Sequence, residues 1–252
     1  MFGNTYHSRR FILYTRLNIY NCRSFHGLTC RSAPKTISDL NIYNMPTTIK
    51  QLVEKVGLSS ADIKEVKWNI PIGCKEEGIY IISLSENVES NRTIKEIPLS
   101  MPILETWIKK LGYFIIDKKE TKNSKIIRER LSGFWIPDES ILYIGKAPLR
   151  KRGGGIGNRV QEYYDTAIGE ARPHAGGHCV KLLENLNELH VFYITCENSE
   201  TIEKEMLSQF GKMASKNIQK SLATKGPILP FANLEDGFKQ RKKHGLSHMK
   251  LK

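Results

Sequence analysis

The chain has 252 residues, with 39 Lys and Arg against 26 Asp and Glu, a formal net charge of +13. No segment approaches the roughly 18 apolar residues that a membrane-spanning helix needs, so we expect no membrane segment and either one domain with additions or two small ones. The excess charge favours a polyanionic partner, either nucleic acid or an anionic membrane surface.

Most of this charge lies at the two ends of the chain. Residues 1–44 carry +5 and residues 239–252 carry +6, whereas residues 45–238 hold 27 basic and 25 acidic residues. The Arg-rich, acid-poor residues 1–44 could be an organelle transit peptide, but we favour an unstructured, spurious extension before a start at Met45. Five irregularly spaced cysteines predict a reducing compartment, the cytoplasm, or an organelle if the leader is genuine.

Residues 45–75 predict a small helical segment. Thr47-Thr48 can cap a first short helix, and Ser59-Ser60 can cap a second that carries Ile63 and Val66. Apolar runs predict three buried strands, at residues 78–84, 141–145 and 189–194.

The spacing of apolar residues predicts further helices, at residues 102–111, 125–131, 158–167, 180–186 and 199–213. Polar or Gly- and Pro-rich stretches predict loops, at residues 85–97, 117–125, 147–157 and 227–233. Residues 239–252 predict a solvated basic tail. The alternation of strands and helices predicts a mixed α/β fold.

The candidate chemistry lies on these strands and helices. Gly78-Ile79-Tyr80 belongs to the first strand, and Tyr143-Ile144-Gly145 belongs to the second and continues into Lys146-Ala147. Arg159 and Tyr163 are four residues apart, so they share one helix face. Glu203 lies on the last predicted helix.

Cleavage of a phosphodiester needs an activated water, stabilisation of the charge on phosphorus, and relief of charge on the leaving oxygen. A Tyr can act as a base if a neighbouring cation lowers its pKa, and the fork of an Arg suits phosphate oxygens. One Glu can hold Mg²⁺, which takes its other ligands from water and phosphate. The residues above supply each of these parts.

At these residues the sequence resembles the GIY-YIG nuclease family, over about residues 76–235. Gly78-Ile79-Tyr80 and the run from Tyr143 to Ala147 are similar to its two half-motifs. Arg159 with Tyr163 is similar to the catalytic Arg and a nearby Tyr or His, Glu203 to the metal-binding Glu, and Asn233 to a closing Asn near the active site.

The resemblance implies a fold of the α+β type, with a small three-stranded antiparallel sheet flanked by helices, and DNA hydrolysis with Mg²⁺ or Mn²⁺. Tyr143 would be the general base or orient the water, Arg159 would stabilise the phosphorane, and Tyr163 would position the phosphate. Tyr80 and Lys146 would tune Tyr143, and Glu203 would bind the metal.

Several features depart from compact members of the family. The half-motif tyrosines are 63 positions apart, which makes the chain more like the larger bacterial members and predicts a helical insertion at residues 85–140 within a domain at 76–238. Three assignments stay open, with these competing residues: Arg152 for Arg159, Glu205 for Glu203, and Asn217 for Asn233.

The Gly-rich loop is also basic and free of acids, and we expect Arg150, Lys151 and Arg152 to contact DNA, with Asn233 nearby. The predicted function is therefore a metal-dependent endonuclease, a phosphodiester hydrolase acting in restriction or repair. The alternative is a DNA-binding module with the same fold but little or no turnover. The oligomeric state is open, although double-strand cuts would call for a dimer.

Overall fold

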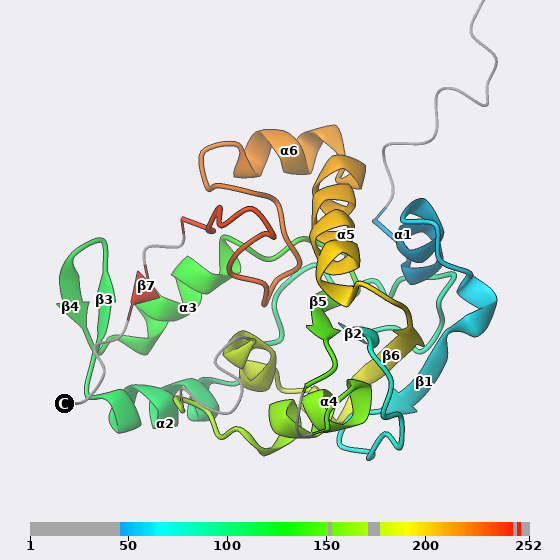
Figure 1. The fold of residues 1–252 in the computed structure, drawn as a ribbon. Helices are drawn as coiled ribbons and strands as arrows, with labels where there is room; N and C mark the ends of the chain where they lie inside the picture. Colours follow the sequence, from blue (N-terminus) through cyan, green and yellow to red (C-terminus); the bar gives the residue numbers. More distant parts are fainter. Residues whose placement is uncertain (1–45, 151–152, 171–176, 244–245, 248–252) are drawn as a thin grey trace, which may run out of the picture. The chain divides into compact units, whose positions relative to one another are not determined.

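The computed structural model describes residues 46–150, 153–170, 177–243 and 246–247 (Figure 1). The leader predicted at residues 1–44 lies outside the described residues. Among the described residues, no helix has both the length and the apolar composition that crossing a bilayer requires. The fold is mixed α/β, as the sequence predicts.

The α-helices begin and end as follows: α1 (Ile49–Lys55), α2 (Met101–Leu111), α3 (Ser124–Ser132), α4 (Ile156–Asp165), α5 (Ser199–Met213) and α6 (Lys216–Leu222). The 3₁₀ turns are η2 (Ser60–Asp62), η3 (His178–Leu182) and η4 (Leu186–Glu188). The strands are β1 (Lys64–Lys67), β2 (Gly78–Ser83), β3 (Phe114–Ile116), β4 (Lys119–Thr121), β5 (Ile141–Ala147), β6 (His190–Thr195) and β7 (Leu246–Ser247).

The main sheet is antiparallel and has four strands in the order β1-β6-β2-β5. The three strands that the sequence predicts are β2, β5 and β6, and the expectation of a three-stranded sheet misses β1. The sequence predicts a second helix here, carrying Ile63 and Val66. Ser59 instead precedes only the short turn η2, and Lys64–Lys67 then pairs with β6. A short, exposed edge strand with one apolar residue, Val66, has too weak an alternation to be recognised.

The two faces of this sheet pack against different helices, because successive side chains of a strand point to opposite sides. Ile79 and Ile81 of β2 face α1 and α5 in one apolar cluster. Tyr80 and Ile82 belong to a second cluster, which contains α4 and much of the region at residues 85–140. The edge strand β5 therefore lies between α4 and α5 (Figure 1).

Two predicted segments differ from the structure in type. The segment predicted as a loop at residues 117–125 contains the hairpin strand β4, which pairs with β3. Where a helix was predicted over 180–186, the chain forms η3 and η4, with Leu182 and Leu183 fully buried. In both places, contacts with distant parts of the chain determine the structure, because the local order of apolar and polar residues only weakly favours one type of element.

The described part of the predicted basic tail is not simply solvated. The side chain of Lys242 is buried, and its Nζ donates to the backbone oxygens of Pro230 (2.6 Å) and Phe231 (2.9 Å). Two residues of the tail form β7, which pairs with β3. The correction has a physical cause: the predicted turn at 227–233 offers carbonyl acceptors that a long Lys side chain can reach.

Candidate active site

Tyr80 and Tyr143 lie side by side on β2 and β5, with their ring centroids 5.9 Å apart. Tyr80 is paired in register with Gly145. A Cβ on Gly145 would come within 2.4 Å of Tyr80 Cζ and 2.7 Å of Tyr143 Cε1. Gly145 is therefore needed in the second half-motif, because the ring of Tyr80 from the first half-motif covers the place that a side chain would occupy.

Burial raises the pKa of both phenols. The pKa of Tyr143 is raised to about 12, mainly by desolvation and then by the negative charge of Glu203, while the charge of Arg159 opposes the shift. The pKa of Tyr80 is also raised by desolvation, and Arg159 again opposes the shift. Both phenols are therefore protonated at neutral pH, which differs from the lowered pKa that a tyrosine base requires. Arg159 and Glu203 lie on α4 and α5, the two helices that contact the strand of Tyr143.

Helix α4 holds Arg159 in a network with Glu162, a residue that the sequence analysis did not single out. The Arg159 guanidinium bonds to Glu162 at 2.7 Å (Nη1 to Oε2), and Arg150 bonds to the other oxygen at 2.5 Å. These two cations lower the pKa of Glu162. The spacing of three residues from Arg159 was the available signal for Glu162. Lys151 and Arg152 lie outside the described residues.

The first N–H groups of α4 are used inside the protein. The amides of Ile156 and Gly157 donate to the carbonyls of Glu76 (3.0 Å) and Cys74 (2.8 Å). Gly155 precedes the helix with φ +91°, and a Cβ there would lie 2.3 Å from the Lys75 oxygen. Any phosphate contact by this loop must therefore come from its side chains rather than from these amides.

Tyr163 is buried beneath this site. Its hydroxyl donates to the Gly177 carbonyl at 2.5 Å, and its ring lies 5.3 Å from that of Tyr143. Only 1% of the residue is exposed. A side chain so enclosed supports Tyr143 from behind, and the expected direct contact with phosphate is not compatible with this position.

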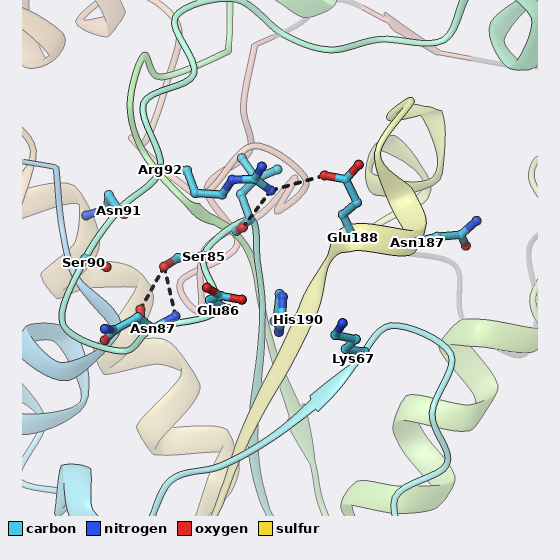
Figure 2. Close-up of a pocket in the computed structure, with 11 residues that line it drawn as sticks. Lys67, Ser85, Glu86, Asn87, Ser90, Asn91, Arg92, Asn187, Glu188 and His190 are labelled. Carbon is cyan, nitrogen blue, oxygen red and sulfur yellow. Dashed lines mark hydrogen bonds and ion pairs between the residues drawn. The ribbon is translucent and has the colours of Figure 1, made fainter.

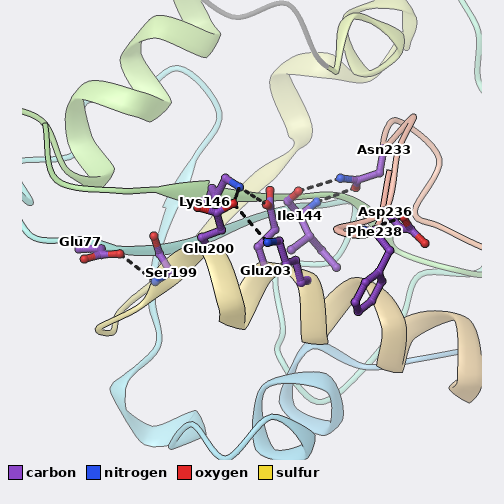
Figure 3. A network of polar contacts seen from close by, with 10 residues as sticks. Glu77, Ile144, Lys146, Ser199, Glu200, Glu203, Asn233, Asp236 and Phe238 are labelled. Atoms are coloured by element: carbon purple, nitrogen blue, oxygen red, sulfur yellow. Dashed lines mark hydrogen bonds and ion pairs between the residues drawn. The ribbon is translucent and has the colours of Figure 1, made fainter. Parts of the chain in front are cut away.

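Lys146 and Glu203 form an ion pair at the other side of β5, with 3.1 Å between Nζ and Oε2 (Figure 3). Glu200 lies 3.5 Å from the same ammonium. Burial raises the pKa of Glu203, and the lysine opposes that shift. Glu205, the competing residue, is exposed on the same helix.

Asn233 fixes the outer edge of β5. Its Oδ1 accepts from the Ile144 N–H at 2.9 Å and its Nδ2 donates to the Ile144 oxygen at 2.8 Å (Figure 3). Next to it, the Ala232 N–H donates to the Leu142 oxygen at 2.8 Å. The buried amide of Asn233 is thus engaged with the strand rather than directed at a ligand. Asn217 is exposed on α6.

The donor set fits a divalent cation held by one carboxylate. Among the described residues, no group of three or more His, Cys, Asp or Glu side chains could enclose a metal. Mg²⁺ commonly uses one or two carboxylates, with waters and substrate phosphates as its other ligands. Glu203 is a hard oxygen donor with 16% of its side chain exposed, which is consistent with that mode of binding.

A polar pocket of about 510 Å³ lies at the other end of β2 and is separate from these residues (Figure 2). Lys67, Arg92 and His190 line it together with several Asn, Ser and Glu side chains. His190 Nδ1 lies 2.5 Å from Glu65, and Arg92 lies 3.4 Å from Glu188. None of the candidate catalytic residues lines this pocket, so it is not the candidate active site.

No protein-family model, curated protein or solved structure matches this chain.

Proposed function

We propose that the protein is a metal-dependent endonuclease of the GIY-YIG type that hydrolyses phosphodiester bonds in DNA. The observation that best supports this proposal is the gathering of charges around Tyr143. Arg159 lies on α4 and Glu203 on α5, both helices contact β5, and Glu203 pairs with Lys146 of that strand. The charges of Arg159 and Glu203 act in opposite directions on the pKa of Tyr143. In this proposal β2, β5 and β6 are the three-stranded sheet of the family, and β1 is an addition at its edge.

The side chains divide the work of phosphate binding and water orientation. Arg159 has N–H donors beyond the one bonded to Glu162, and they would bind the non-bridging oxygens of the scissile phosphate. Glu162 would fix the guanidinium in that position. Because Tyr143 is protonated at neutral pH, it would orient the attacking water by hydrogen bonding, and the proton of that water would leave to bulk solvent rather than to Tyr143. Tyr80 and Tyr163 would hold the ring of Tyr143 in place.

Glu203 would hold Mg²⁺ or Mn²⁺, and the cation would neutralise charge on the phosphate when bound. In the structure the Lys146 ammonium neutralises this carboxylate. Lys146 has 32% of its side chain exposed, so it can move to a phosphate oxygen when a metal takes its place.

A DNA-binding module without turnover is the second candidate. The observation that favours it is the raised pKa of both Tyr80 and Tyr143, since neither phenol is poised to act as a base. The two candidates share the same DNA contacts and differ only in whether the bound strand is cut.

The test is nicking of supercoiled plasmid with Mg²⁺ or Mn²⁺, together with DNA binding measured in EDTA. Glu203→Gln should lower the nicking rate by about 10² or more, the scale seen when an electrostatic contact to the transition state is removed, and leave binding in EDTA intact. Glu205→Gln, two residues along the same helix, is the matched control and should behave as wild type. Equal nicking by both variants would refute the site, and binding without nicking by the wild type would select the second candidate.

A further inference from the structure

Residues 109–130, which we call the basic arm, concentrate charge within the folded part of the chain. They contain eight basic and three acidic residues, a net charge of +5. The rest of residues 45–238 contains 19 basic and 22 acidic residues, a net charge of −3. Residues 45–238 are therefore nearly neutral only because the positive charge of the basic arm offsets the net negative charge of the other residues.

Most cations of the basic arm are exposed and unpaired within the described part of the chain. Two of its charges are compensated, since Arg130 pairs with Asp117 at 2.5 Å and Lys110 pairs with Glu170 at 3.3 Å. Six further cations are exposed and form no ion pair among the described residues: Lys109, Lys118, Lys119, Lys122, Lys125 and Arg128. The remaining acids of the arm, Glu120 and Glu129, are exposed as well.

Tertiary structure brings these cations together from separate elements. Lys109, at the end of α2, and Lys122, just before α3, line one hollow of about 430 Å³, which Glu105 also borders. Lys118 and Lys119 lie at the tip of the hairpin, where Lys118 has a left-handed backbone (φ +70°). Lys125 lies in the first turn of α3.

The C-terminal segment, the other basic part of the described chain, joins the same sheet. Strand β7 pairs with β3 through Ile116↔Leu246, which gives the strand order β4-β3-β7 (Figure 1). Lys239 and Lys243, shortly before β7, are exposed. Lys243 stands three residues before Leu246, so the chain places it within roughly 11 Å of the strand that pairs with the basic arm.

We propose that the basic arm, together with Lys239 and Lys243, forms a binding surface for the phosphate backbone of double-stranded DNA. The choice of DNA as the polyanion rests on the proposed function. Exposed lysines contact phosphates without reading bases, so this surface would supply affinity and orientation rather than sequence preference.

The test is a salt titration of binding to a fluorescent DNA duplex, by anisotropy in EDTA, with the full-length protein. The arm variant carries Lys118→Gln, Lys119→Gln, Lys122→Gln and Lys125→Gln. Its matched control replaces four exposed lysines of α1, α5 and α6 by Gln: Lys55, Lys212, Lys216 and Lys220.

The slope of log affinity against log salt is about −0.9 for each phosphate neutralised, so the arm variant should flatten it by up to about 3.6. Between 50 and 200 mM salt the wild type should then lose up to about 150-fold more affinity than the arm variant. The control should keep the wild-type slope.

The outcomes separate this surface from the proposed function. If the arm variant and its control have the same slope, the surface is refuted even if the protein cuts DNA. If the arm variant alone loses slope but the wild type never nicks plasmid, the surface stands and the nuclease proposal falls. If the wild type binds an RNA duplex more tightly than the DNA duplex and the arm variant loses affinity only for RNA, the proposal of DNA as partner is overturned.

Discussion

Replacement of Gly145 by Ala tests the most specific packing relation in the candidate site. The added Cβ would lie 2.4 Å from Tyr80 Cζ and 2.5 Å from its hydroxyl oxygen, whereas non-bonded carbon atoms prefer about 3.5–4.0 Å. Tyr80 is 1% exposed, so its ring cannot swing into solvent, and Tyr143 Cε1 blocks the other side at 2.7 Å. One of the two rings or β5 itself must shift by about 1 Å.

Overpacking of a core by one carbon typically costs about 1–3 kcal/mol of unfolding free energy. For a domain of this size that corresponds to a Tm lowered by about 2–12 °C. Gly73→Ala is the control, because a Cβ there would meet no atom within 4 Å. Its Tm should stay the same or rise slightly, since Ala restricts the unfolded chain.

Thermal unfolding followed by circular dichroism measures both variants, and plasmid nicking reports whether the displaced rings matter to the proposed reaction. Tyr80→Leu removes the two nearest colliding atoms and leaves Tyr143 Cε1, so the cost of Gly145→Ala should fall but not vanish in that background, as a double-mutant cycle would show. The reasoning would be refuted if Gly145→Ala were as stable as Gly73→Ala. It would also be refuted if Gly145→Ala lowered the unfolding free energy as much in the Tyr80→Leu background as in the wild type.

Two further predictions concern the segments that hold β5. Asn233→Ala leaves the backbone groups of Ile144 without partners and should cost about 1–3 kcal/mol in urea unfolding, whereas Asn217→Ala on the exposed face of α6 should cost little. Lys242→Met should change the pH dependence of stability, because desolvation lowers the pKa of Lys242 to about 7 in the folded protein. Between about pH 7 and the unfolded pKa near 10.4, the unfolded chain binds more protons at this lysine, so its contribution to stability increases with pH.

A different result would contradict each of these two predictions. Equal stability of the Asn233 and Asn217 variants would show that the edge of β5 does not depend on the side-chain amide. For Lys242, unfolding free energies at pH 7 and pH 9 should differ more in the wild type than in Lys242→Met, with Lys220→Met as the exposed control. A parallel pH dependence in all three proteins would show that Lys242 is not buried as the structure describes.

The local pattern of apolar residues was sufficient to predict an element whose position depends only on its own sequence. The apolar runs of β2, β5 and β6 and the helical spacing of α5 predict these elements because burial of a strand or helix face imposes its own periodicity. The capping box of α1, in which Thr48 accepts from Gln51 N–H and the Gln51 side chain accepts in return, confirms the first predicted helix. The half-motifs could be found on the same basis, since each lies within one strand.

The assignment of roles within the site depended on contacts between distant segments. Tyr163 shares a helix with Arg159, but only its enclosure by Gly177 and Tyr143 shows that it supports the site from behind. Glu162 was overlooked because its importance comes from two arginines that converge on it.

The sequence by itself determined the mixed α/β class, the three inner strands, and the presence of tyrosine, arginine and glutamate groups on elements that could hold them. Tertiary structure alone decided that β1 extends the sheet, that Asn233 fixes β5, that Lys242 is buried, and that the C-terminal strand β7 pairs with β3. The reason is physical: periodicity records which face of an element is buried, whereas a hydrogen bond, an ion pair or an edge pairing depends on a partner that the local sequence does not contain.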